Sequence, residues 1–81
     1  MNALRTLQVF IHPNCPHSKA LVEDFRRRGL SFIEIDISDD EGLRQLQAVC
    51  WEQKLPIVLD HERLSIGFRG LSSTFEELGI E

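Results

Sequence analysis

The stretch TLQVFIHPNCPHSKALVEDFRRRG, residues 6–29, decides the fold of this chain. Residues 6–11 are apolar and rich in β-branched side chains, which predicts a buried strand. After a short polar loop, Pro16 stands where a first helical residue belongs, because its missing N–H has no partner there in any case. We therefore predict a helix from Pro16 to about Arg28, ended by Gly29. The residues expected to face inward are Ala20, Leu21, Val22 and Phe25.

This arrangement puts Cys15 at the N-terminus of the predicted helix. Unpaired backbone amides and the positive end of the helix dipole point at its sulfur there. Such a setting favours the thiolate, the form that attacks disulfides, so we expect Cys15 to be a nucleophile. His17 can add positive charge when it is protonated, and the hydroxyl of Ser18 falls within reach of the sulfur. The alternatives are an inert cysteine, a solvated histidine and a serine that only begins the helix.

The following residues predict a second strand and a second helix. Residues 31–37 alternate between apolar and polar or aromatic side chains, with three isoleucines on one face, as in a strand. Residues 38–41, Ser-Asp-Asp-Glu, have the pattern of a capping box, in which the serine hydroxyl and the glutamate each satisfy an exposed amide. The helix that they start is expected to extend to about Gln53.

The last third of the chain predicts a hairpin and a short helix. Pro56 opens a strand at 57–59, and a turn at 60–62 leads to a strand at 63–66. Leu71, Phe75 and Leu78 then recur at helical spacing. The expected order is β-α-β-α-β-β-α, an α/β domain with a four-stranded mixed sheet and helices on both faces.

Composition narrows the possible functions. The 81 residues are enough for one domain, residues 1–81, and the net charge of −4 argues against nucleic-acid binding. The basic cluster of residues 26–28 falls at the end of the first helix, where it complements the negative helix terminus. No apolar run approaches the ~18 residues of a membrane span and no signal peptide is recognised at Met1, so we expect a cytoplasmic protein without a membrane partner.

The second cysteine, Cys50, lies at helical spacing with Leu43 and Leu46. That places it on the buried face of the second helix, and free cysteine is among the most buried residue types. We therefore expect it to pack in the core rather than to act as a resolving thiol. His61, in the hairpin turn, is expected at the surface.

These residues resemble the thioredoxin superfamily and, within it, the glutaredoxins. The resemblance rests on the strand Val9–Ile11, the motif Cys15-Pro16-His17-Ser18, Leu55-Pro56-Ile57 and Ile66-Gly67 ahead of the last helix. It implies a thioredoxin-like fold with a cis Leu55–Pro56 bond facing Cys15. It also implies that the backbone of Leu55 pairs with a bound peptide in the manner of an added strand.

The resemblance further implies thiol–disulfide exchange by a glutaredoxin-like oxidoreductase. Cys15 would form a mixed disulfide with a glutathionylated or disulfide-containing client protein. Because Ser18 replaces the second cysteine of the motif, glutathione or another small thiol would complete the cycle as a co-substrate, with no permanently bound cofactor. The residues implied to bind the client or glutathione are His12, Pro16, Lys54, Leu55, Pro56, Gly67, Phe68 and Arg69.

Several positions differ from the usual glutaredoxin pattern. His12 and Lys54 replace a lysine and a threonine, and Phe68 and Gly70 replace a glycine and an aspartate, all at positions that normally hold glutathione. Gly67-Phe68-Arg69 also resembles the small redoxins that reduce ribonucleotide reductase. These differences leave a non-catalytic module that binds peptides or senses redox state as the alternative function.

A metal-binding function is the less favoured alternative. Some single-cysteine relatives share an iron–sulfur cluster between two protomers, but they carry Gly-Phe where this chain has Pro16 and His17. The run His12, Cys15, His17 lacks a fourth ligand and matches no common structural zinc spacing, so no metal site is expected.

Overall fold

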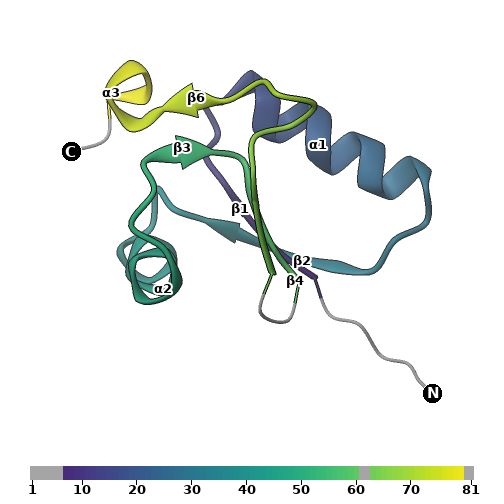
Figure 1. Cartoon of the computed structure of the whole chain (residues 1–81), viewed down its shortest axis with the longest axis horizontal. Helices are drawn as coiled ribbons and strands as arrows, with labels where there is room; N and C mark the ends of the chain where they lie inside the picture. The colour runs from purple at the N-terminus through teal and green to yellow at the C-terminus, as the bar shows by residue number, and fades with distance from the viewer. Residues whose placement is uncertain (1–6, 61–62, 80–81) are drawn as a thin grey trace.

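The computed structural model describes residues 7–60 and 63–79 as a four-stranded mixed sheet between helices, with a separate two-stranded sheet beside it (Figure 1). The strands of the main sheet lie in the order β2-β1-β4-β5 and comprise β1 (Leu7–Ile11), β2 (Phe32–Asp36), β4 (Ile57–Asp60) and β5 (Arg63–Ile66). β1 and β2 are parallel, while β4 is antiparallel to both β1 and β5. The predicted α/β class and parallel first unit are confirmed. His61, in the predicted turn, lies outside the described residues.

Alternation along β1 sends neighbouring side chains into two separate cores. Val9 packs on one face with Leu21 and Val22 of the first helix. Phe10 packs on the other face in a larger cluster, whose other buried members are Cys15, Ile35, Ile37, Leu46, Leu55, Ile57 and Phe75. Burying a side chain such as Phe10 contributes about 1.5–3 kcal/mol. The helices therefore cover both faces of the sheet.

Helix α1 (Pro16–Arg27) begins at the predicted residue and ends one residue before the predicted end. Gly29 follows it with φ of +72°, in the left-handed region that favours glycine. Of the residues expected to face inward, three are buried or half-buried, but Ala20 is exposed. That prediction was wrong because Ala20 lies about 200° around the helix from Val22, outside the apolar stripe.

Helix α2 (Asp40–Val49) corrects two predictions. Asp39, not Ser38, is the N-cap residue and makes no side-chain bond to the helix, so the predicted capping box does not form. The Ser38 amide instead donates to Oδ1 of Asp36 at 2.9 Å. The helix also ends before the predicted Gln53, because the chain turns extended at Cys50 and leads into β3.

The C-terminal region also differs from the prediction. A two-stranded antiparallel sheet, β3 (Lys54–Leu55) with β6 (Ser73–Thr74), was not expected. Figure 1 shows it above the main sheet. Helix α3 (Phe75–Leu78) is shorter than predicted because a capping box between Thr74 and Glu77 starts it late. Leu71 is therefore outside the helix and exposed, contrary to the prediction.

Candidate active site

Cys15 is the N-cap residue of α1, as the sequence predicted. Its backbone is extended, with φ of −99° and ψ of 106°, and its amide donates to the carbonyl of His12 at 3.0 Å. The loop thus turns the side chain back over the first turn of the helix. There the sulfur accepts a hydrogen bond from the Ser18 amide at 3.3 Å. An amide at the positive end of a helix stabilises a thiolate more than a thiol.

The segment opposite Cys15 contains the cis peptide bond between Leu55 and Pro56, as expected. The Cys15 sulfur lies 3.9 Å from the Leu55 carbonyl oxygen, so the thiol faces the backbone that the resemblance assigned to a bound peptide. The sulfur is not open to solvent in this arrangement, since Cys15 is 0% exposed. The helix start, the proline segment and the surrounding core cluster, which includes Phe75, therefore enclose the thiol.

Ser18 contacts the sulfur through its backbone rather than through its side chain. The predicted bond from the hydroxyl to Cys15 is not formed, because the amide of the same residue makes the contact. The side chain is 1% exposed, and among the residues that the structure describes its hydroxyl has no hydrogen-bond partner. Ser18 and His12 are both among the residues that line a groove of about 380 Å³ between α1 and β2.

His12 and His17 have different surroundings. His12 is buried, and its Nδ1 accepts the Asn14 amide at 3.0 Å, so it braces the loop before the thiol. His17 is half-buried in the first turn of α1. Its positive charge lies near Glu77, whose pKa is lowered mainly by hydrogen bonds from the Thr74 amide and hydroxyl and slightly by His17.

Glu77 is thus a residue at the edge of the site that the sequence interpretation missed. The signal that could have found it is the pattern Thr-x-x-Glu at residues 74–77, which is itself a capping box. The carboxylate is held by the Thr74 amide at 2.9 Å. Because Thr74 pairs with Lys54 across the small sheet, Glu77 is tied to the strand that carries Leu55.

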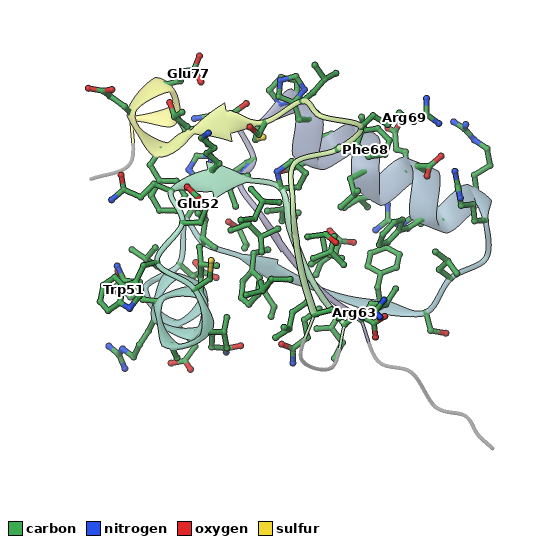
Figure 2. The ribbon with its side chains drawn as sticks, in the orientation of Figure 1. Trp51, Glu52, Arg63, Phe68, Arg69 and Glu77 are labelled. Carbon is green, nitrogen blue, oxygen red and sulfur yellow. The ribbon has the colours of Figure 1, made fainter. Side chains whose placement is uncertain are left out.

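The three residues of the Gly67-Phe68-Arg69 segment contact two different parts of the protein, the cis-proline segment and helix α1 with its core. The Gly67 amide donates to the Pro56 carbonyl at 2.7 Å and so supports the cis-proline segment. Phe68 packs against the core on the α1 side of the sheet. The Arg69 guanidinium lies over the Phe68 ring, 5.3 Å from the ring centre, and one of its nitrogens is 4.0 Å from a carboxylate oxygen of Asp24 in α1. Figure 2 shows Arg69 beside this helix.

Arg69 is consequently held apart from the thiol. Asp24 lies nine residues after Cys15, about 13 Å along the helix axis. Lys54, by contrast, directly precedes Leu55 and is exposed. Of the cations predicted to bind an anionic client, Lys54 is adjacent to the cis-proline segment and Arg69 is beside the middle of α1.

Within residues 7–60 and 63–79, no group of three or more histidine, cysteine or acidic side chains could hold a metal ion. In the same part of the chain, no helix has the length and apolar character needed to cross a bilayer.

A helix that starts at a cysteine, packed on a mixed sheet and facing a cis-proline, defines a thioredoxin-like protein. A family model described as Glutaredoxin matches residues 7–53, more than half of the chain. The chain belongs to the glutaredoxin family. No curated protein sequence matches it significantly.

Two solved structures support the same fold. The glutaredoxin of Archaeoglobus fulgidus superimposes with a TM-score of 0.69 at 19% identity, covering 82% of this chain and 78% of that one. A mutant of a thioredoxin-like protein superimposes with a TM-score of 0.70 at 20% identity, covering 90% and 93% of the two chains. At this level of identity, the likeness establishes the fold.

Proposed function

We propose that this protein catalyses thiol–disulfide exchange through a single nucleophilic cysteine, Cys15. The observation that carries the proposal is the position of its sulfur, which receives the Ser18 amide at a helix N-terminus while facing the Leu55 carbonyl. The amide favours the thiolate, and the Leu55 backbone lies where a client strand would bring its own sulfur. Membership of the glutaredoxin family supports the same chemistry.

The reaction balances with two external partners. The Cys15 thiolate attacks one sulfur of a glutathionylated or disulfide-containing client, and a new S–S bond forms as the old one breaks. The departing thiolate takes a proton from solvent. Because Ser18 stands in place of a second thiol, glutathione or another small thiol must attack the mixed disulfide, leave as the new disulfide and release Cys15 as thiolate. Reduced cytoplasmic thiol pools would supply that reductant.

Client binding is assigned to the rim around the sulfur. Leu55 and Pro56 would align the client backbone, and Lys54, one residue earlier, would attract a client or glutathione carboxylate. Pro16 is exposed at the start of α1, beside the thiol. His17, half-buried next to Pro16, adds a polar imidazole to the same rim.

The test uses a short peptide carrying one glutathionylated cysteine. Incubation without added reductant should leave either glutathione or the peptide on Cys15, identified by mass spectrometry of the digested protein. The Cys50→Ser variant serves as the matched control and should form the same adduct. An adduct found on Cys50 alone, or on neither cysteine, would contradict the proposal.

The full burial of Cys15 favours a second candidate, a module that binds peptides or senses redox state without turnover. Such a module would form one mixed disulfide and stop. Adding reduced glutathione to the same reaction separates the two functions. An enzyme consumes many equivalents of peptide disulfide per protein, whereas a module consumes at most one.

A further inference from the structure

The backbone of Leu55 is already hydrogen-bonded within the chain. In the small sheet, Leu55 is opposite Ser73 and Lys54 is opposite Thr74. The next pair in the same register is joined by a bond from the Phe75 amide to the Gln53 carbonyl at 2.9 Å. Antiparallel pairs alternate between hydrogen-bonded and non-hydrogen-bonded. Since Gln53 and Phe75 are a bonded pair, Lys54 and Thr74 are a non-bonded pair, and Leu55 and Ser73 are again a bonded pair. The N–H and C=O of Leu55 therefore both face β6.

This pairing coincides with the burial of the nucleophile. The Leu55 carbonyl that faces Ser73 is also the group 3.9 Å from the Cys15 sulfur. Phe75, directly after β6, belongs to the buried cluster that contains both Cys15 and Leu55. A client sulfur has to contact the Cys15 sulfur to react, and a residue with 0% exposure offers it no approach.

The segment that carries β6 contributes little apolar surface to the core, although Ser73 itself is buried. Before it, Phe68 and Leu71 close a tight turn through two backbone bonds, with Arg69 and Gly70 between them at positive φ. Leu71 is exposed, and β6 itself has two residues. A short strand paired on one edge, with little apolar burial, belongs to the part of a protein that opens at low cost.

We propose that residues 71–74, which we call the strap, occupy the place of the client strand, and that a client binds by displacing the strap from Leu55. The inference rests on the proposed function, since it describes how the client reaches the same thiol. Displacement costs few hydrogen bonds overall, because the incoming strand offers Leu55 the same N–H and C=O partners that Ser73 gave up. It exposes the Cys15 sulfur only while the strap is displaced.

The first test measures alkylation of Cys15 by iodoacetamide in the Cys50→Ser background. Ser73→Pro removes the amide that pairs with Leu55 and should raise the rate at least tenfold at every pH. Ser73→Ala keeps that amide and is the matched control, expected to react at the rate of the parent. An equal rate in all three proteins would overturn the strap.

The second test needs no change in the strap and so holds even if Ser73→Pro fails to fold. A peptide whose cysteine is activated as a thionitrobenzoate disulfide is added to the Cys50→Ser protein. The Cys15 thiolate forms an S–S bond to the peptide, and thionitrobenzoate leaves as a thiolate. Hydrogen exchange should then show that the Ser73 amide loses protection while the Leu55 amide keeps it. Protection retained at both amides contradicts displacement.

The two tests separate the strap from the proposed function. Fast alkylation of Ser73→Pro without turnover of any glutathionylated peptide would support the role of the strap and contradict the proposed enzymatic function. Normal turnover with an alkylation rate that Ser73→Pro does not change would do the opposite.

Discussion

The two cysteines of this protein have the same hydrogen bond at opposite ends of two helices. The Cys15 sulfur accepts the Ser18 amide at 3.3 Å, and the Cys50 sulfur accepts the Glu52 amide, also at 3.3 Å. Cys15 begins α1, where the free amides make a positive end, whereas Cys50 follows α2, where the free carbonyls make a negative end. One hydrogen bond therefore accompanies two opposite electrostatic environments.

The more exposed of the two cysteines is the one that we expect to be less reactive. Cys50 is half-buried beside Trp51, which is 85% exposed and points away from the molecule (Figure 2). Cys15 is enclosed but faces the Leu55 carbonyl. Under the proposed function, position on a helix and the group across from the sulfur mark the nucleophile, and access to solvent does not. The structure also agrees with the prediction that Cys50 packs against the core, although part of its side chain is exposed.

The largest expected effect is the loss of turnover when Cys15, rather than Cys50, is replaced. Cys15→Ser should lower turnover of a glutathionylated peptide by roughly 10³-fold or more, because no other described thiol occupies a helix N-terminus. Cys50→Ser should keep most of the activity. Steady-state rates with reduced glutathione measure both variants. Equal losses in the two variants would mean that the helix ends do not distinguish the thiols.

The second prediction asks whether the Cys50 region is structural. Gly42 of α2 lies directly on the end of β2, so that a Cβ there would come 2.1 Å from the Asp36 carbonyl oxygen. Gly42→Ala should therefore lower the free energy of unfolding by about 2–3 kcal/mol, measured in urea. Gln45→Ala, exposed on the same helix, should change it by less than about 0.5 kcal/mol.

Catalysis is the second readout for Gly42→Ala. Turnover per folded molecule should remain near that of the parent, because α2 supports the core rather than the thiol. A fall in turnover per folded molecule, at unchanged stability, would place α2 in the chemistry.

The strand, loop and helix of residues 6–29 could be predicted because their signals are local. Apolar periodicity, Pro16 at the first helical position and Gly29 after the last one all act within a few residues. The N-cap position of Cys15 followed from them. The cis bond at Pro56 came from the resemblance, since an X-Pro bond permits either isomer and local sequence does not choose between them.

The small sheet of β3 and β6 could not be predicted, because two-residue strands are too short to show a periodic pattern. β3 and β6 form only because the fold brings residues 54–55 and 73–74 together. Capping boxes show the same limit: both Ser38 and Thr74 begin the pattern Ser/Thr-x-x-Glu just before a helix, but of these two only Thr74 forms the box. At the first position, the Asp36 carboxylate takes the Ser38 amide, and the helix starts one residue later.

The third prediction compares the two thiols across pH. The positive end of α1 stabilises an anionic sulfur at Cys15, whereas the negative end of α2 gives the Cys50 sulfur no such support. Alkylation at pH 6 should therefore label Cys15 roughly tenfold faster than Cys50 in the Ser73→Pro variant, in which access to Cys15 is open. At pH 9 the two rates should converge, as quantified by peptide mass spectrometry. Preferential labelling of Cys50 at pH 6 would reverse the assignment.

The smallest effect concerns Glu77, which caps α3 beside the strap. Hydrogen bonds from the Thr74 amide and hydroxyl lower the pKa of Glu77 below its usual value, so the folded protein stabilises the carboxylate. That contribution is complete above the ordinary glutamate pKa of about 4.3 and is lost as pH falls through the lowered value. Glu77→Gln should therefore reduce Tm slightly at pH 7, and the difference from the parent should shrink steadily below about pH 4. Thermal scans from pH 3 to pH 7 measure it, with Glu76→Gln, a neighbour in the same turn without the Thr74 contacts, as the matched control. If the two variants lose the same amount at every pH, the capping box contributes nothing beyond the general charge of the helix start, and β6 then depends on its pairing with β3.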